Sequence, residues 1–456
     1  MRGLSGAFVF STLNGREMVS TSNGRSIQFD IFPSEIITGA QVYKSQKASL
    51  IEGGVGATIN LDTASALDIE EDQKFRASLH GNYNEAAADN EDSDTFGRRL
   101  TLSYQAKFLD ETLGLSLGWA NMFQPTVSSR FVNRAFDEVD FSSAYDGAPT
   151  TDIFVSSGFE INEGGGEDER DAFVIALNWE PSDGLRFQFD AFHSIFDSNK
   201  WDRGIRVDGL RGVESGGASL LDNPLLSGNN LVGGTFYRDA DGSAVAPPFG
   251  PVSGITVQTQ ADDNTTNSKS SAFGFNAEWD ISDDLMMTVD IAHSKDEETL
   301  KDKVLRMAYF EDSSAAMPVI DDNIILTYQL NGTNLPTVAF NQDFTDTDHM
   351  MVTSAESYPR IESNSSDAIK VDFTYQLESD VFSEVEFGAR ASKRDYELGR
   401  GRFVYGPSDF AMRNGQYLSL TPSEGCDSFE VEDQTVYNCA PFQLNDNNSS
   451  VTSIGG

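Results

Sequence analysis

The sequence predicts a membrane protein of the all-β class, an incomplete antiparallel transmembrane β-barrel with a small α/β unit at its N-terminus. Three features of the sequence predict this fold. Apolar and polar residues alternate along paired segments, very short turns join the two segments of each pair, and long polar connections separate the pairs.

The composition is compatible with a membrane protein that has no transmembrane helix. Only 39% of the 456 residues are hydrophobic, and we find no apolar run of about eighteen residues, the length that a transmembrane helix needs. A transmembrane β-strand faces lipid with every second residue only, so the mean hydropathy of -0.36 does not exclude the membrane.

The formal net charge of -40 bears on the class of partner. A protein that binds nucleic acid needs a basic surface to neutralise phosphates, so a nucleic-acid partner is not expected. Solvated acidic loops are the simpler interpretation of the charge, and a surface that collects cations is the alternative.

Residues 1–68 predict a small mixed α/β unit with short elements. Two Asn-Gly pairs, Asn14-Gly15 and Asn23-Gly24, indicate tight turns. The segment 35–45 predicts a short helix that passes into a strand, and Thr58–Thr63 predicts the last strand of the unit. The glycine-rich segment before that strand predicts a sharp turn of the backbone.

Residues 69–456 predict about nine to ten barrel strands. A single strand at 74–83 is followed by four hairpins, at 100–121, 172–196, 272–294 and 368–392. The connections between hairpins, about 122–170, 197–270, 294–366 and 394 onward, are expected to be long loops at one end of the barrel. A soluble β-sandwich or β-helix is the alternative.

The two faces of these strands differ in polarity. One face carries large apolar residues such as Phe173, Phe187, Phe273 and Val371, as lipid contact requires. The other face is charged, and its residues are expected to line a water-filled lumen because they are costly in a dry core. They include Lys370, Asp372, Glu378, Glu384, Glu386 and Arg390.

The first 68 residues resemble the plug domain of TonB-dependent receptors of Gram-negative outer membranes. The pieces that carry the resemblance follow one another in the family's order: "RGLS" with Arg2 and Gly3, "TLNGRE" with Asn14 and Gly15, "FDIFPSEIITGAQVYKS" at 29–45, and "IEGGVGATINLDT" at 51–63 with Glu52, Gly53, Gly54 and Gly56. One departure is Ala57, where the family commonly has a second glycine. The wording is most similar to the proteobacterial subgroup associated with uptake of carbohydrates or other nutrients.

The resemblance implies a division of the chain and its incompleteness. Residues 1–68 are then the C-terminal part of a plug domain, and 69–456 are the N-terminal portion of the barrel. The family's barrel has about twenty-two strands, so we expect this chain to be a fragment that cannot insert and transport alone, because unpaired strand edges cannot face lipid.

The resemblance also implies a function and partners. The receptor takes up a scarce nutrient actively into the periplasm, whether a carbohydrate, a siderophore or a cobalamin, with energy from TonB, which binds a segment missing from this chain. We expect the cell outer membrane as the location, long extracellular loops, contact with outer-membrane lipid, and no enzyme activity, cofactor or metal. A passive porin or surface adhesin, and a secreted β-rich enzyme, are the alternatives.

Two sets of residues are candidates for other roles. Cys426 and Cys439 lie in a polar stretch with turn residues, which favours a loop disulfide in an oxidising compartment over two free thiols. The aromatic residues of the long connections either stack on a sugar or siderophore or pack within their loops. They are Phe236, Tyr237, Tyr309 and Phe310.

Overall fold

The computed structural model is built almost entirely from β-strands. It describes residues 8–21, 37–48, 50–53, 56–90, 93–142, 148–213, 219–238, 255–311, 321, 323–378, 381–401, 403–405, 427–431, 434–438 and 442–443. Within these ranges the only helices are short 3₁₀ turns. None of the helices in these ranges has the length and apolar character to cross a bilayer.

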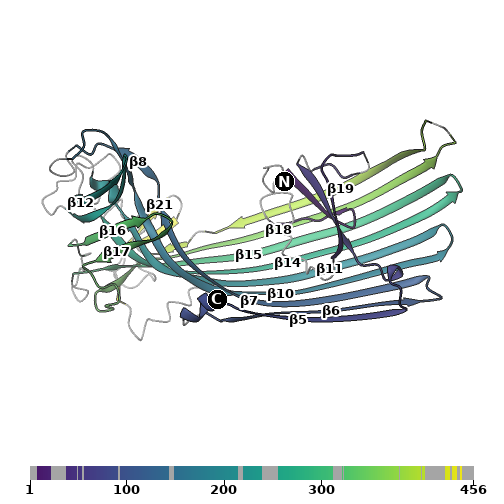
Figure 1. Cartoon of the computed structure of the whole chain (residues 1–456), viewed down its shortest axis with the longest axis horizontal. Helices are drawn as coiled ribbons and strands as arrows, with labels where there is room; N and C mark the ends of the chain where they lie inside the picture. The colour runs from purple at the N-terminus through teal and green to yellow at the C-terminus, as the bar shows by residue number, and fades with distance from the viewer. Residues whose placement is uncertain are drawn as a thin grey trace.

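A large antiparallel sheet dominates the molecule (Figure 1). Its strands follow the order β19-β18-β15-β14-β11-β10-β7-β6-β5, so each strand pairs with its neighbours along the sequence of long strands. The bounds are β5 Gln73–Tyr83, β6 Phe96–Phe108, β7 Leu113–Asn133, β10 Gly158–Ser182, β11 Leu185–Asp208, β14 Thr256–Ser282, β15 Leu285–Tyr309, β18 Met350–Gln376 and β19 Glu384–Arg400. Among the described residues β5 pairs only with β6.

Short turns join the strands at one end of the large sheet, which confirms the four predicted hairpins. Gly184 closes the β10–β11 turn with a φ of 77°, a conformation that glycine adopts without a steric penalty. The β6–β7 turn is less usual, because Leu109, Asp110 and Glu111 all have positive φ.

The strands extend much further than the sequence predicts. The connections predicted as loops at 122–170, 197–270 and 294–366 contain the outer parts of β7, β10, β11, β14, β15 and β18. β10, for example, begins at Gly158 rather than near residue 172. These extensions are polar on both sides, so they lack the apolar alternation by which a strand is recognised.

Six further strands in the described part of those connections form a second sheet, which we call the exterior sheet (Figure 1). Its strands are β8 Phe136–Val139, β9 Ile153–Ser156, β12 Ser219–Ser227, β13 Asn230–Arg238, β16 Ile325–Asn331 and β17 Asn334–Phe340. It lies at the end of the large sheet opposite the short turns. The described parts of the predicted long loops are therefore folded, around a hydrophobic core that they share with the outer ends of β10, β11 and β14.

The large sheet has an outward face and an inward face, defined by register. Phe173, His193, Ser271, Lys295 and Ser365 are cross-strand partners in successive pairs and share the outward face. The outward face near the short turns carries exposed apolar side chains, which we call the apolar belt: Phe75, Leu79, Leu117, Phe173, Ile175, Trp179, Phe189, Phe273, Phe275, Trp279, Ile281, Ile291, Ile369, Tyr375, Val385 and Phe387.

The exterior sheet covers the other end of the same outward face. Phe159, Val207 and Val257 are cross-strand partners on β10, β11 and β14, and all three are buried. They share one core cluster with Phe236 and Leu326 of the exterior sheet. Along the strands from the short turns to the opposite end, the outward face is thus first apolar and exposed, then polar, and finally covered by the exterior sheet.

A small sheet of four strands lies on the inward face (Figure 1). It has the order β2-β1-β4-β3, with β1 Val9–Leu13, β2 Arg16–Glu17, β3 Ile37–Tyr43 and β4 Ala57–Thr63. Strands β1 and β4 are parallel, and the other two pairs are antiparallel. The predicted final strand of this unit is confirmed, but residues 37–43 of the segment predicted as helix and strand are strand only.

Candidate functional site

The candidate site is the contact between the small sheet and the inward face of the large sheet. Its apolar part is modest. Leu13, Met18 and Leu61 of the small sheet pack on the inward residues of β10, β11 and β14. These inward residues are Ala172, Val174, Phe192 and Ala272. Most of the specific contacts around this patch are polar.

Arg16 is a buried charge of the contact. Its Nε donates to Asp290 Oδ2 at 2.8 Å, and its Nη1 donates to Asp190. The Arg16 side chain is only 7% exposed. Two carboxylates from two different strands therefore hold one buried guanidinium, and removal of any partner would leave a buried charge uncompensated.

Gly274 of β14 makes room for this guanidinium. It is the cross-strand partner of Asp190 on β11, and a Cβ at Gly274 would fall on the Arg16 guanidinium group. The strand neighbour Asn276 also donates to Asp290, at 3.3 Å. The absence of a side chain at Gly274 and the two flanking acids, Asp190 and Asp290, together form the binding site of Arg16.

Glu17, the next residue, contacts β19. Its carboxylate lies 3.3 Å from Arg390 Nη2 and 3.8 Å from Arg394 Nη1. Arg394 also donates from Nε to Asn364 at 2.9 Å, and Asn364 in turn donates to the carbonyl of Ser20 at 2.7 Å. The two charges of β2 thus bind opposite charges on β11, β15 and β19.

The segment after β2 runs along β15 and bonds to it through its backbone. The amide of Val19 donates to Ser294 Oγ at 3.0 Å, and the amide of Thr21 donates to Asp296 Oδ2 at 2.7 Å. Asp296 also accepts from Ser270 on β14, at 2.5 Å. Side chains of the large sheet therefore accept hydrogen bonds from backbone amides of the segment after β2, as buried amides require.

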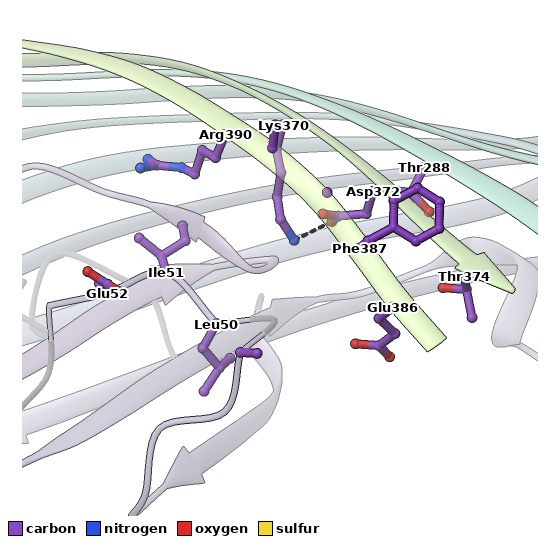
Figure 2. Close-up of a pocket in the computed structure, with 13 residues that line it drawn as sticks. Leu50, Ile51, Glu52, Thr288, Lys370, Asp372, Thr374, Glu386, Phe387 and Arg390 are labelled. Carbon is purple, nitrogen blue, oxygen red and sulfur yellow. Dashed lines mark ion pairs between the residues drawn. The ribbon is translucent and has the colours of Figure 1, made fainter. Parts of the chain in front are cut away.

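A cavity of about 660 Å³ remains on the β18–β19 side of the small sheet (Figure 2). Leu50, Ile51 and Glu52 border it from the small unit. Lys370, which is ion-paired with Asp372, lies across from them on β18. A second cavity of about 170 Å³ continues from it toward Arg16 and shares five of its lining residues, namely Ile51, Thr288, Lys370, Asp372 and Arg390.

The inward face between the small sheet and the exterior sheet is strongly charged. Asp202 and Asp262 are cross-strand partners there, and Arg306 and Glu356 form an ion pair of 3.2 Å. The pKa of Asp262 is raised to about 6, chiefly by burial; Arg306 lowers it, and the nearby acids Asp302, Asp202 and Glu160 raise it. Asp262 is therefore a carboxyl group that gains a proton near neutral pH.

The Asn14-Gly15 pair forms the predicted tight turn. Both residues have positive φ, 50° and 77°, which is the type I′ geometry of a hairpin. The Asn14 side chain and the Thr63 amide bond at 2.9 Å, and the Gly15 amide donates to Asn60 at 2.7 Å. The turn is therefore hydrogen-bonded to β4, and it places Arg16 against the inward face of the large sheet.

The glycine-rich segment is described only in part, and its described residues have separate positions. Glu52 is exposed at the cavity, and the Gly56 amide donates to the Phe8 carbonyl at 2.8 Å. Gly53 has a φ of 158°. Ala57 begins β4 and has no positive φ, so alanine is tolerated where the family has glycine. Arg2, Gly3, Gly54, Cys426 and Cys439 lie outside the described residues.

The loop aromatics pack within the protein rather than facing solvent. Phe236 and Phe310 are fully buried, and Tyr309 stacks on His349 with a centroid separation of 4.8 Å. The sequence reasoning missed the role of Arg16, Glu17 and Gly274. The position of Arg16 and Glu17 directly after an Asn-Gly turn was a signal in the sequence for these two residues. No signal in the sequence marked Gly274.

Comparisons with known proteins are limited. No protein-family model matches the sequence, and no curated protein matches it significantly. Among solved structures, the siderophore receptor PirA from Pseudomonas aeruginosa is similar at 10% identity over 88% of this chain and 79% of that chain, with a TM-score of 0.24. The siderophore receptor PirA from Acinetobacter baumannii is similar at 8% identity over 89% and 73%, with a TM-score of 0.24. These TM-scores are too low to assign a function.

Proposed function

We propose that the chain is part of an active nutrient receptor of a Gram-negative outer membrane. The large sheet is then a portion of the barrel wall, and residues 1–68 belong to the plug that fills its lumen. The observation that carries the proposal is the opposite character of the two faces of one sheet. Apolar side chains are exposed on the outward face, and a folded unit is held by charges on the inward face.

The apolar belt supports contact with lipid. Phe273 and Trp279 on β14 are 47% and 50% exposed, and Ile291 on β15 is 48% exposed. Exposed apolar surface of this extent is unfavourable in water, and patches this large mark protein or membrane contacts. Because the belt spans neighbouring strands at one level of the sheet, a bilayer is the partner that fits it.

The polar character of the inward contact supports a movable plug. Its specific contacts are ion pairs and hydrogen bonds to wall residues such as Asp190, Asp290 and Asp296. Water can replace such contacts when the plug shifts, whereas a large apolar contact would resist separation. We propose that energy from the inner membrane, transmitted by TonB, drives this shift and opens a path for the nutrient.

The nutrient class follows less directly from the residues. A carbohydrate, a ferric siderophore or a cobalamin is the class we propose, and the acids at the outer part of the inward face disfavour a strongly anionic ligand. These acids include Asp262 and its neighbours Glu160, Asp202 and Asp302.

Uptake by intact cells tests the proposal. Cells that carry the receptor would be given labelled ferric siderophore, cobalamin and maltodextrin in turn, with and without TonB. We expect one of these probes to accumulate only in the presence of TonB. Equal uptake without TonB would rule out an energised mechanism.

A surface adhesin is the second candidate, and the exterior sheet favours it. Leu221, Phe236 and Leu326 of this sheet pack in one hydrophobic core with the outer ends of β10, β11 and β14, so the sheet is a preformed structure rather than a set of flexible loops. Loss of cell adhesion without loss of uptake, after removal of β12 and β13, would favour the adhesin over the receptor.

A further inference from the structure

The exterior sheet has a second face, opposite the one that packs on the large sheet. Leu221, Phe236 and Leu326 lie in the shared core and are cross-strand partners on β12, β13 and β16. Because successive residues of a strand point to opposite sides of a sheet, their neighbours point away from that core. These neighbours form one row across the three strands: Leu220, Tyr237 and Ile325.

The next row on the same face is polar and uncharged at three of its positions. Thr235 pairs with Thr327, and their hydroxyl oxygens lie 3.0 Å apart. Thr327 pairs in turn with Ala339 on β17. We call the six uncharged residues of the two rows the neutral face: Leu220, Thr235, Tyr237, Ile325, Thr327 and Ala339.

The neutral face presents both apolar surface and hydroxyl groups to a partner. Leu220 and Ile325 are 36% and 44% exposed, on either side of Tyr237. A threonine hydroxyl has one donor and two acceptor positions, so the bond between Thr235 and Thr327 leaves one of their two hydrogens available to donate. The face is therefore suited to a partner that offers the same combination of apolar and hydrogen-bonding groups.

The four strands that carry the neutral face contain very little charge. In sequence, β12, β13, β16 and β17 include one acid, Asp222, and one base, Arg238. The hydroxyl of Tyr237 donates a hydrogen bond to Asp222. The whole chain has 72 acidic and 32 basic residues. These strands thus differ from the rest of the molecule, because their formal charges cancel.

The neutral face points away from the barrel wall. The opposite face of its sheet packs on Phe159, Val207 and Val257, which belong to the outward face of the large sheet. In our proposed function the wall stands upright in the bilayer, so the neutral face is directed sideways above the membrane surface and away from the lumen. A partner on this face is a neighbour of the receptor rather than the nutrient on its path inward.

Charge favours a second copy of the chain as that neighbour. Two proteins of formal charge -40 repel each other wherever acidic surfaces approach within the Debye length, about 8 Å at physiological ionic strength. A face whose charges cancel is where this repulsion is weakest. A different protein attracted by charge would be basic and would bind an acidic face instead. A two-fold interface brings one patch against itself, and an uncharged patch permits this.

We propose that the neutral face binds the neutral face of a second copy in a symmetric dimer. Leu220, Tyr237 and Ile325 lie at the centre of the contact, and the threonines exchange hydrogen bonds across it. The face spans four strands, roughly 19 Å at about 4.8 Å per strand, so the contact is small and the dimer dissociates at micromolar concentrations. The contact itself goes beyond the proposed function and needs only the exterior sheet.

The mass of the purified chain in detergent tests the proposal. Analytical ultracentrifugation in a density-matched neutral detergent gives the dissociation constant of the dimer. Ile325→Glu brings like charges together at the contact and should weaken the dimer about tenfold or more. Val132→Glu is the control, because Val132 is 37% exposed on β7, outside the exterior sheet. A chain that is monomeric throughout the micromolar range, or equal dissociation constants for both variants, would contradict the dimer.

Mixing two variants separates loss of the contact from loss of the fold. Ile325→Lys alone should be monomeric like Ile325→Glu, because each variant repels its own copy. An equal mixture of the two should dimerise again, since opposite charges then meet across the contact. A misfolded exterior sheet would not recover on mixing. A mixture of folded variants that stays monomeric shows that Ile325 does not face its counterpart.

Added salt should strengthen the dimer of the unaltered chain. Salt screens the repulsion between the acidic surfaces of the two copies and removes no attraction from an uncharged contact. We expect the dissociation constant to fall as sodium chloride rises from about 20 mM to about 300 mM, where the Debye length becomes shorter than 10 Å. A dimer that weakens with salt would indicate ion pairs across the contact and would contradict the neutral face as its centre.

Two further outcomes assign the face or the membrane differently. A monomeric chain that retains the neutral polysaccharide dextran, and loses it on Ile325→Glu, assigns the neutral face to a glycan and contradicts the dimer. A chain that dimerises but binds no detergent micelle contradicts the apolar belt, and with it the proposed function, while the dimer stands. A chain that binds a micelle as a monomer contradicts the dimer alone.

Discussion

Arg16 and Gly274 form a matched pair at the scale of single residues. The guanidinium lies where a side chain at Gly274 would stand, and Asp190 and Asp290 flank it. From the sequence, Arg16 is recognisable only as a residue after a turn, and its acidic partners only as polar positions on strands. Arg16 is 174 residues from Asp190 and 274 from Asp290, and pattern within one segment carries no information on such pairings.

Gly274→Val should displace Arg16 and loosen the small sheet. The added side chain takes the place of the guanidinium and leaves two buried carboxylates without their partner, at a cost of about 3 kcal/mol. We expect faster hydrogen exchange of residues 9–21, with the large sheet unchanged. Gly81→Val is the control, because the nearest atom to a Cβ there is 3.9 Å away. Equal exchange in both variants would contradict the role of Gly274.

Asp262→Asn should raise stability most at alkaline pH. The pKa of Asp262 in the folded protein is about 6, above the ordinary value of 3.8. The folded state therefore binds a proton more tightly than the unfolded state, and this group destabilises the fold above pH 6 and ceases to do so as pH falls toward 4.

Unfolding temperatures in detergent at pH 8 and pH 5 check this prediction. Asp262→Asn should exceed the unaltered chain at pH 8, and the difference should shrink at pH 5. Asp263→Asn is the control, because Asp263 is exposed and paired with Arg203. A stabilisation by Asp262→Asn that is the same at both pH values would contradict the raised pKa.

At the scale of elements, the sequence predicts only the strand segments that have one apolar and one polar face. The run from Phe273 to Ile281 alternates because one side must be apolar and the other polar. The outer part of β14, from Thr256 to Ser270, is mainly polar on both faces and shows no apolar period. The exterior sheet escaped prediction for a different reason, since its strands are short and a Pro224 interrupts β12.

Phe236→Ala should unfold the exterior sheet while the large sheet persists. Phe236 is fully buried between Tyr328 and the rest of the core, and truncation of a buried phenylalanine costs about 3 to 5 kcal/mol. Limited proteolysis should then cut within 219–238. Leu220→Ala is the control, because Leu220 is 36% exposed on the other face. Equal cleavage of both variants would contradict the role of Phe236 in that core.

At the scale of the whole molecule, the two faces of one sheet decide between a membrane wall and a soluble core. Among the large apolar residues predicted to face lipid, Phe173 and Phe273 are each 47% exposed, and Phe187 and Val371 are half-buried. The small sheet and the segment after β2 lie on the opposite face, through Arg16, Glu17 and Thr21. Alternation along single strands predicts the two faces, but only the register between strands shows that the belt is continuous.

Phe275→Lys should weaken association with lipid or detergent. Phe275 lies in the middle of the apolar belt, and a lysine on the lipid face near the midplane costs about 2 to 4 kcal/mol. Less bound detergent by light scattering, or weaker partition into vesicles, is the expected result. Leu335→Lys is the control, because Leu335 is 52% exposed on the exterior sheet. An equal effect of both substitutions would contradict a lipid-facing belt.

Quenching by a brominated alkyl detergent tests the central claim most directly. The chain has four tryptophans. Two single-tryptophan variants, with the other three replaced by phenylalanine, would retain Trp279 of the belt or Trp201, which lies on the polar part of the outward face of β11. We predict strong quenching of Trp279 and little quenching of Trp201. Equal quenching of the two, or no quenching of Trp279, would contradict a wall whose outward face meets lipid.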